Sequence, residues 1–306
     1  MYIMVIDVIA IKNLIVKTAQ EMAEDDIKIN MQMGKNGSVL FNNNDTIMTH
    51  CNAGSLATVA YGTALGVIRA TKESGKNVKV IATETRPVQQ GSRLTAFELK
   101  HDGFDVSLIP DTAVGYTMAN KLVNKVVVGA DRVLRTGHVY NKIGTYQVAL
   151  IAKQHRIPFY VAAPLSTFDM KSTPQDVIIE QRKGTEVTQI GDRKTAPDGI
   201  NVINPAFDMT PPELISGIIT EAGVAKPPLK DLGIDPSTSR QVLVKDGRFG
   251  MYVTDGETNA TLRRGDTLEA LDLDRANELL AGRRAWEAEN GGVKVKKTRK
   301  KASKKS

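Results

Sequence analysis

Short apolar runs alternate with helical patterns through the middle of this chain. The apolar runs have the length of strands and lie at residues 46–49, 78–82, 104–109, 125–130 and 158–162. Between them, apolar residues recur at helical spacing over residues 56–74, 93–100, 112–122 and 142–155. Strands that alternate with helices of this length form a parallel sheet with helices on both faces. The sequence therefore predicts an α/β fold with a doubly wound parallel sheet.

Segments of different character flank this Rossmann-like sheet, which we expect over residues 46–228. Residues 1–45 are predicted to form a helical segment, because their apolar positions recur at roughly helical spacing. The proline-bearing residues 225–229 form a stiff connector to a small α+β module at residues 229–290. A disordered, lysine-rich tail is expected at residues 291–306.

The positive charge of the chain is confined to its C-terminal end. The formal net charge is +7, but residues 294–306 carry eight Lys or Arg side chains and no acidic one. Without those eight charges, residues 1–293 have a net charge of −1, so the body is nearly neutral. The composition, 41% hydrophobic and 25% charged, is that of a soluble globular protein.

The start of the chain does not resemble a targeting segment. It lacks a basic region and contains Asp7 and Lys12, so neither a signal peptide nor a membrane span fits. A single cysteine excludes an internal disulfide and fits a reducing compartment. We therefore expect a cytoplasmic protein without membrane contact.

The only cysteine, Cys51, lies between an apolar strand and a turn of small residues. In an open parallel sheet the carboxyl ends of the strands share one edge, where ligands bind. Asp131, residues 83–90 and a predicted helix start at Asn141 and Lys142 follow other strands, so we expect them to meet Cys51 around one crevice. Simpler interpretations stay open: the cysteine as a core hydrophobe, and the aspartate as a helix cap or the partner of the arginine that follows it.

A series of short motifs resembles one known family. The motifs are residues 50–54 (HCNAG), 84–87 (ETRP), 90–93 (QGSR), 129–132 (GADR), 141–146 (NKIGTY), 162–167 (AAPLST) and 204–213 (NPAFDMTPPE). In this order they resemble the methylthioribose-1-phosphate isomerases, relatives of the initiation factor 2B regulatory subunits. The likeness covers about residues 11–228.

The resemblance implies an aldose–ketose isomerase that converts 5-methylthioribose 1-phosphate to 5-methylthioribulose 1-phosphate in L-methionine salvage. It places the catalytic pair on Cys51 and Asp131, and substrate binding on Gln90, Asn141 and Lys142. It also implies a homodimer, a sugar-phosphate substrate, and neither a cofactor nor a metal ion. The reaction needs one group at carbon and one at the hydroxyls, which suits a thiol and a carboxylate in a dry pocket. Proton abstraction and hydride shift both stay open.

The chain also departs from the family. Family members carry an additional N-terminal domain whose arginine motifs help to hold the substrate phosphate, and we expect this domain to be missing here. Two alternatives therefore stand beside the leading hypothesis. One is a ribose 1,5-bisphosphate isomerase, and the other is a catalytically impaired regulatory or dimerising domain.

A second resemblance concerns the C-terminal module. Residues 232–236 (LGIDP), 244–250 (VKDGRFG) and 252–262 (YVTDGETNATL) resemble the C-terminal repeat of actinobacterial-type DNA topoisomerase I, although Ser239 and Met251 depart from its pattern. The two resemblances point to no pathway in common, and a gene fusion, a gene-model artefact and a misjoined sequence are all compatible with the sequence.

The second resemblance implies weak binding of single-stranded DNA. Phe249 and Tyr252 would stack on bases beside Lys245 and Arg248, and the basic tail would add salt-dependent affinity. The alternative is that both aromatic rings form the core of the module, with strands at residues 241–244 and 251–254 around an Asp-Gly turn and a helix at residues 274–284.

Overall fold

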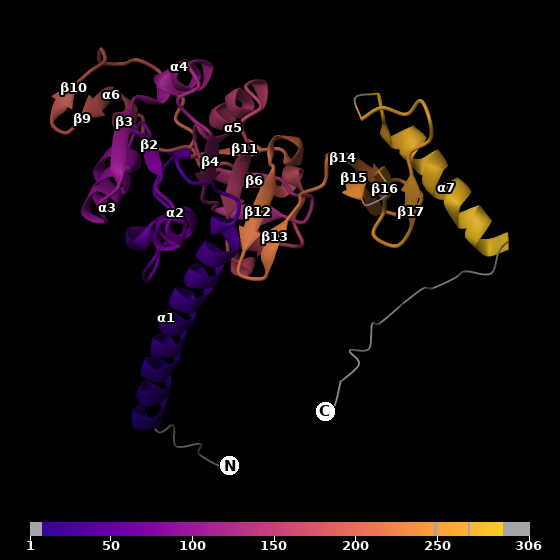
Figure 1. Ribbon diagram of the computed structural model, residues 1–306, viewed down its shortest axis with the longest axis horizontal. Helices are drawn as coiled ribbons and strands as arrows, with labels where there is room; N and C mark the ends of the chain where they lie inside the picture. The colour runs from indigo at the N-terminus through magenta and orange to yellow at the C-terminus, as the bar shows by residue number, and fades with distance from the viewer. Residues whose placement is uncertain (1–7, 248–249, 269, 290–306) are drawn as a thin grey trace. The chain divides into compact units, whose positions relative to one another are not determined.

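The computed structural model describes residues 8–247, 250–268 and 270–289. The chain divides into two compact units, Met1–Pro227 and Pro228–Ser306. Figure 1 follows the chain through both units, which we describe separately.

The first unit is built on a seven-stranded sheet. Its strands are β1 (Thr46–Thr49), β2 (Lys79–Thr83), β3 (Asp105–Ile109), β4 (Lys125–Val128), β7 (Phe159–Ala162), β12 (Gly217–Thr220) and β13 (Gly223–Ala225). The spatial order is β13-β12-β7-β4-β1-β2-β3, and all neighbours are parallel except β12 and β13. The chain runs outward from β1 to β3 and then returns to β4 on the other side of β1. The predicted α/β fold with a parallel sheet is thus confirmed.

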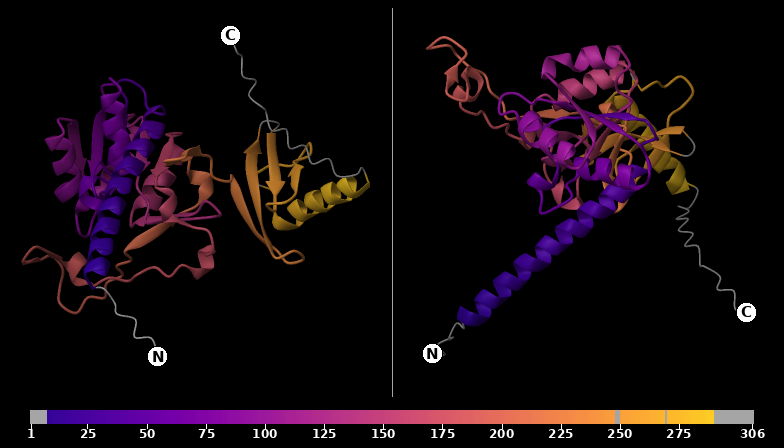
Figure 2. Two further views of the ribbon diagram at one scale, coloured as in Figure 1. Left: turned by 90° about the horizontal axis from the view of Figure 1, so that it is seen from below. Right: turned by 60° about the vertical axis from the view of Figure 1, so that its left-hand side comes forward.

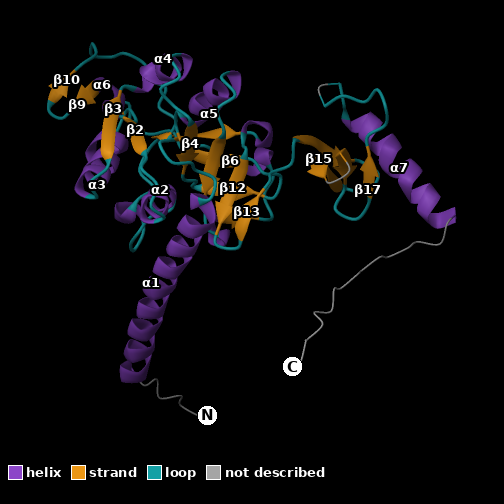
Figure 3. Cartoon of the chain, viewed as in Figure 1, coloured by secondary structure: helices purple, strands orange, loops and turns teal. Residues whose placement is uncertain are grey.

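Helices cover both faces of this sheet, as Figure 3 shows. The helices of the first unit that take part are α1 (Val8–Ser38), α2 (Ala64–Glu73), α3 (Ala96–His101), α4 (Val114–Ala119) and α5 (Thr145–Gln154). The first three share one apolar core with Ile47 and Val127, and the last two share the other with Met48 and Val126. Successive residues of a strand point to opposite faces, so each apolar strand supplies both cores.

Helix α1 is only partly covered. Buried residues lie in its last third, from Asn30 to Ser38, and Figure 2 shows its N-terminal part extending away from the sheet. Gly34 and Gly37 allow the close approach to α2, because a Cβ atom at Gly34 would lie 2.9 Å from the Gly66 carbonyl oxygen. In the described part of the chain, no helix combines the length and apolarity needed to span a membrane.

One predicted helix begins later than expected. The pattern predicted a helix from residue 56, but α2 begins at Ala64, and a short 3-10 turn at Ser55–Ala57 precedes it. Tyr61 and Gly62 have φ angles of +72° and +82°, which an α-helix excludes. This left-handed backbone brings the chain back against the turn that follows Cys51. A Cβ atom at Gly62 would lie 2.4 Å from the Gly54 Cα atom.

A second correction concerns Asn141 and Lys142, which were predicted to start a helix. They lie on β6 (Val139–Lys142), and α5 begins at Thr145 after Gly144, whose φ is +101°. Strand β6 belongs to a four-stranded sheet of order β11-β6-β5-β8, which the sequence did not predict. Its other strands are β5 (Arg132–Leu134), β8 (Phe168–Asp169) and β11 (Phe207–Thr210).

Short elements connect these layers. A π-helical turn at Gly91–Thr95 leads into α3, and a small excursion contains α6 (Thr185–Thr188), β9 (Gln189–Ile190) and β10 (Arg193–Lys194). The 3-10 turns are η3 (Asp111–Ala113), η4 (Leu165–Thr167), η5 (Pro174–Asp176) and η6 (Pro212–Leu214). Gly91 touches the end of β2, because a Cβ atom there would lie 1.7 Å from the Thr83 carbonyl oxygen.

The second unit is an antiparallel sheet with one helix. Its strands, in spatial order, are β14 (Lys230–Asp235), β15 (Arg240–Gly247), β16 (Gly250–Thr254) and β17 (Asn259–Thr261). Helix α7 (Leu273–Glu289) buries Ala276, Leu279 and Leu280 against the sheet residues Val244 and Val253. The two predicted strands lie within β15 and β16 and the predicted helix within α7, whereas β14 and β17 were not predicted. The predicted disordered tail lies outside the described residues.

We expect Gly91→Ala to destabilise the first unit by about 3 kcal/mol, as a severe overpacking substitution does. The added methyl group would meet the backbone of Thr83, which cannot move without disturbing β2. Gly115→Ala is the matched control, because a Cβ atom there meets nothing within 4 Å and alanine favours the helix α4 by about 0.5 to 1 kcal/mol. Urea denaturation followed by circular dichroism measures both. Equal unfolding midpoints for the two variants would show that the close approach is not needed.

Candidate active site

Three of the five predicted isomerase-site residues, Cys51, Gln90 and Asp131, follow the neighbouring strands β1, β2 and β4. Cys51 follows β1 and Asp131 follows β4, which pair in parallel. The backbone N–H of Asp131 donates to the Tyr140 carbonyl oxygen at 2.9 Å, so β6 and its residues Asn141 and Lys142 lie beside it. The Cys51 thiol is close enough to Asp131 and Lys142 for both charges to affect its pKa.

The backbone of Cys51 is fixed in an unusual conformation. Its φ is +64°, in the left-handed region. Its N–H donates to the Thr85 hydroxyl at 2.9 Å, and its carbonyl oxygen accepts from the Thr95 hydroxyl at 2.6 Å. Both threonines are fully buried, so solvent does not compete for these bonds. The thiol therefore leaves the strand in one defined direction.

The buried carboxylate of Glu98 holds the turn that follows. It accepts hydrogen bonds from the Ser55 N–H at 2.7 Å, the Ser55 hydroxyl at 2.6 Å and the Asn52 amide at 2.9 Å. Arg69 balances its charge at 2.9 Å. Burial alone would raise the pKa of Glu98, but the bonds from Ser55, Asn52 and Arg69 hold the pKa below its ordinary value.

A second carboxylate, that of Asp111, holds the loop after β2. It accepts the backbone N–H groups of Thr85 at 2.8 Å and Arg86 at 2.6 Å. This loop continues to Gln90, whose side-chain Oε1 is buried and has no hydrogen-bond partner among the described residues. A buried amide oxygen without a partner is costly for the protein alone, so it is suited to accept a hydroxyl of a ligand.

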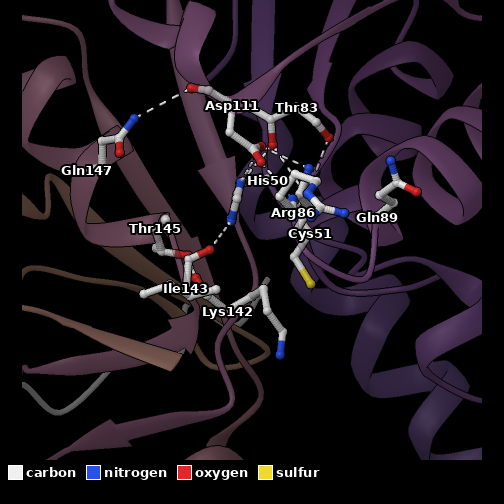
Figure 4. A network of polar contacts seen from close by, with 12 residues as sticks. His50, Cys51, Thr83, Arg86, Gln89, Asp111, Lys142, Ile143, Thr145 and Gln147 are labelled. Atoms are coloured by element: carbon white, nitrogen blue, oxygen red, sulfur yellow. Dashed lines mark hydrogen bonds and ion pairs between the residues drawn. The ribbon is translucent and has the colours of Figure 1, made fainter. Parts of the chain in front are cut away.

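His50 connects three segments beneath the thiol. Its Nδ1 lies 2.6 Å from the Thr83 hydroxyl and its Nε2 lies 2.9 Å from the Ile143 carbonyl oxygen. Figure 4 shows this network, with the Cys51 thiol and the Lys142 ammonium pointing away from it toward the same side. Lys142 Nζ also lies 4.4 Å from the centroid of the Phe207 ring.

The thiol and the carboxyl are both electrostatically unusual. Burial raises the pKa of the Cys51 thiol to about 11, with Asp131 adding to the rise and Lys142 opposing it. Asp131 itself is exposed, so the site is not the dry pocket that the sequence suggested; the protein around its carboxyl still desolvates it in part and raises its pKa, against the effect of Lys142. At neutral pH Cys51 is therefore a thiol and not a thiolate, beside a carboxyl group that holds its proton more tightly than usual.

Asn141 and Asp208 organise the start of α5. The Asn141 amide donates to the Thr145 hydroxyl at 2.9 Å. The Asp208 carboxylate accepts the backbone N–H groups of Gly144 at 2.7 Å and Tyr146 at 3.1 Å, where a helix start favours negative charge. Burial nevertheless raises the pKa of Asp208 to about 6.

A surface hollow of about 470 Å³ adjoins Asp131. It is lined by Arg132 and by the segment from Ser166 to Lys171, and an ion pair of 3.2 Å between Arg132 and Asp169 crosses its wall. The alternative role of Asp131 as the partner of Arg132 is thus taken by Asp169. In residues 8–247, 250–268 and 270–289, no group of His, Cys, Asp and Glu side chains is arranged to hold a metal ion.

Sequence reasoning missed the supporting groups His50, Glu98, Asp111 and Asp208. Glu98 lies in a helical pattern, and Asp111 directly follows a proline. Acidic residues are common in both settings, so neither position stands out in the sequence. His50 precedes Cys51 in the motif at residues 50–54, and Asp208 lies in the motif at residues 204–213. These positions were the signals by which the two residues could have been found.

In the second unit, two of the four predicted nucleic-acid residues can be placed. Lys245 and Tyr252 are register partners on β15 and β16, and both are half-buried. Their neighbours Val244 and Val253 face the buried core, so Lys245 and Tyr252 lie on the other face of the sheet. Arg248 and Phe249 lie outside the described residues.

Two solved structures and one curated relative illustrate the similarity to known proteins. Methylthioribose-1-phosphate isomerase of Thermosipho africanus is 56% identical over 214 residues, which are 70% of this chain and 62% of the relative. The crystal structure of 5-methylthioribose 1-phosphate isomerase from Pyrococcus horikoshii matches with a TM-score of 0.68 and 45% identity, over 71% of this chain and 61% of that one. The crystal structure of translation initiation factor eIF-2B, subunit delta, from A. fulgidus matches with a TM-score of 0.69 and 52% identity, over 71% and 64%.

The chain spans about three-fifths of the length of the curated relatives it matches. Its second unit matches the family model of the topoisomerase C-terminal repeat over residues 235–290. The model of the initiation factor 2 subunit family matches residues 3–227, which include every element of the seven-stranded sheet and all five predicted site residues. By this match and by the identity to its relatives, the chain belongs to the initiation factor 2 subunit family.

Proposed function

We propose that the first unit is an aldose–ketose isomerase that converts 5-methylthioribose 1-phosphate to 5-methylthioribulose 1-phosphate, a reaction of L-methionine salvage. The observation that carries the proposal is the convergence of the half-buried Cys51 with Asp131 and Lys142, because β1 and β4 are neighbours and the Asp131 N–H bonds the strand that ends at Lys142. The relatives named as methylthioribose-1-phosphate isomerases support the choice of substrate.

The reaction opens the sugar ring and moves one hydrogen. The hydrogen on C2 moves to C1, the C2 hydroxyl loses its proton as the ketone forms, and the ring oxygen gains a proton. An ionised Asp131 can take the hydroxyl proton, because its raised pKa makes it a stronger base than a solvated aspartate. The Cys51 thiol can supply a proton, since it keeps its own at neutral pH. Proton abstraction and hydride shift differ only in how the hydrogen travels between the carbons.

The remaining site residues suit the polar groups of a sugar phosphate. Lys142 carries a positive charge on a flexible stem, which can hold a phosphate or a developing oxyanion. The unpaired Oε1 of Gln90 can accept a sugar hydroxyl. Asn141 is buried and lies on the same strand as Lys142.

Two alternatives differ in substrate or in class. A ribose 1,5-bisphosphate isomerase would use the same groups on a sugar with a second phosphate. A non-catalytic regulatory role is the alternative from a different class, and one solved relative is named as a subunit of translation initiation factor eIF-2B. We infer in addition a homodimer built on the first unit, as symmetric pairs are the commonest oligomers, and a cytoplasmic location.

We propose a separate activity for the second unit, weak binding of single-stranded DNA with little sequence preference. The match to the topoisomerase repeat supports it. So does the placement of Lys245 beside Tyr252 on the sheet face opposite α7, where a ring can stack on a base next to a cation. The basic residues 294–306 would add affinity through counterion release.

The Cys51→Ala and Asp131→Asn variants are each expected to lower kcat for 5-methylthioribose 1-phosphate by about 10² to 10⁴, the usual contribution of a positioned acid or base. Asp105→Asn is the matched control, because Asp105 forms an exposed ion pair with Lys79 at the opposite end of the strands. Steady-state kinetics on the purified full chain measures the effect.

Turnover by either variant at the parent rate would contradict the catalytic assignment. A higher kcat/KM for ribose 1,5-bisphosphate would favour the first alternative, since an apolar pocket and a cationic one discriminate strongly between the two sugars. No turnover, together with no thermal shift at saturating sugar phosphate, would favour the regulatory role.

The pH dependence is expected to report Asp131 and Cys51. Activity should fall on the acid side as Asp131 gains a proton, at a higher pH than for an ordinary aspartate, and on the alkaline side as the thiol ionises near its pKa of about 11. Lys142 lowers both pKa values, so Lys142→Met should raise both. The pH profile of iodoacetamide alkylation at the single cysteine measures the thiol directly, with Lys79→Met as the control. A shift to lower pH in Lys142→Met would contradict the arrangement.

Measurements of single-stranded DNA binding should distinguish the contribution of the Tyr252 ring from that of the basic residues 294–306. Tyr252→Ala is expected to weaken binding of a fluorescent oligonucleotide by about 1 to 3 kcal/mol, while deletion of residues 294–306 should flatten the dependence of affinity on salt. Tyr116→Ala is the control, because Tyr116 is an exposed tyrosine on α4 of the first unit. If fluorescence anisotropy of the oligonucleotide does not change with the parent chain at low salt, the DNA-binding proposal is wrong.

A further inference from the structure

We propose that His50 is a positioning residue that fixes the Cys51 thiol relative to the Lys142 ammonium through its bond to the Ile143 carbonyl. The inference deepens the proposed isomerase function and rests on it. His50 precedes Cys51 in the chain, and Ile143 follows Lys142. One hydrogen bond of 2.9 Å therefore joins the direct neighbours of two proposed site residues that are far apart in the sequence.

The bond crosses between two sheets. Cys51 follows β1 of the seven-stranded sheet, whereas Lys142 ends β6 of the four-stranded sheet. No ladder of backbone hydrogen bonds pairs β1 directly with β6 among the described strands, and the backbone links them only through β4 and Asp131, so a side-chain bond between the two ends adds a direct connection. His50 is 2% exposed and occupies this position.

Only one neutral tautomer of the ring satisfies both contacts. A carbonyl oxygen can only accept, so Nε2 carries a hydrogen and donates it to Ile143. In the neutral ring Nδ1 then accepts from the Thr83 hydroxyl, at 2.6 Å. Burial lowers the pKa of His50 and favours the neutral ring, against the effects of the Ile143 carbonyl and Asp111. The ring thus connects the ends of β1, β2 and β6.

Packing prevents the ring from turning. Gly144 lies against the ring, because a Cβ atom there would lie 3.0 Å from His50 Cε1 and 3.1 Å from Nε2. The φ of Gly144 is +101°, which other residues rarely adopt, so this close approach is part of the local backbone. Asp208 holds the same turn through the Gly144 N–H at 2.7 Å. The imidazole is therefore held by a hydrogen bond at each nitrogen and by contact at its edge.

Loss of the ring would leave two polar groups without this partner. It would also remove a contact that sets the distance between Cys51 and Lys142. The part-buried Ile143 carbonyl and the buried Thr83 hydroxyl would each lose a hydrogen-bond partner. The loop after β6 would then relax, and Lys142 would move with it. A misplacement of about 1 Å at a reacting group can cost about 10²-fold in rate.

The test compares His50→Leu with His50→Gln in the full chain. Leucine removes both hydrogen bonds, whereas the glutamine amide can still donate to the Ile143 carbonyl. We expect His50→Leu to lower kcat about 10²-fold, and His50→Gln to recover about tenfold of that loss. The matched control is His138→Leu, because His138 is 8% exposed and bonds a threonine, Thr136, at 2.9 Å in the same unit. His138→Leu should lower the thermal midpoint but keep kcat.

A second readout does not need the substrate. Cys51 is the only cysteine, so alkylation by iodoacetamide reports this site alone. A freed and less buried thiol has a lower pKa, and a fall of one unit raises the rate about tenfold at neutral pH. We expect this increase in His50→Leu and not in His138→Leu. If the parent chain shows no isomerase activity, the proposed function is wrong, and the alkylation rates still decide the role of His50.

The inference is overturned if His50→Leu has the parent's kcat and alkylation rate, or if His138→Leu changes both as much. Should His50→Leu fail to fold, Thr83→Val removes the hydroxyl bond at nearly constant volume. Thr83→Ser keeps that bond and should restore the parent's alkylation rate, whereas Thr83→Val should not. Equal rates for the two threonine variants would also overturn the proposal.

Discussion

The geometry of the site depends on two buried or half-buried carboxylates that bind backbone N–H groups. Glu98 accepts the bonds of the turn after Cys51, and Asp111 accepts those of the loop after β2. Strand ends in a parallel sheet leave backbone groups without ladder partners, and a buried N–H without a partner is costly. A carboxylate satisfies several at once and directs each loop. Arg69 then offsets the buried charge of Glu98, so the anchor does not itself become an electrostatic cost.

The sequence predicted the sheet and the convergence of its strand ends, because both follow from local patterns and from the handedness of crossovers. The start of α2 and the strand β6 could not be predicted in the same way. Tyr61 has a left-handed backbone, which a tyrosine in the sequence does not indicate. Strand β6 pairs with β11, which lies more than sixty residues later in the chain. Asn141 and Lys142 are polar, so only this distant pairing makes them part of a strand.

The second sheet changes how the site is built. A parallel sheet alone brings Cys51 and Asp131 together, since β1 and β4 are neighbours. The proposed phosphate-binding charge comes from β6 instead, which continues from Asp131 through the short strand β5. The chain thus crosses from one sheet to the other between Asp131 and Lys142. A ligand bound by all three residues would contact both sheets, and the contacts between the sheets would control its position.

The state of the thiol separates this site from those in which cysteine is a nucleophile. Nucleophilic cysteines lie beside cations or helix N-termini, which lower the thiol pKa toward neutrality. Here burial is the largest effect and Lys142 only reduces it, so the pKa rises to about 11. An isomerase gains from this arrangement, because a thiolate would attack an open-chain carbonyl and trap it. A protonated Cys51 is instead an uncharged group that can donate a proton. The positive charge proposed to hold the phosphate is carried by Lys142.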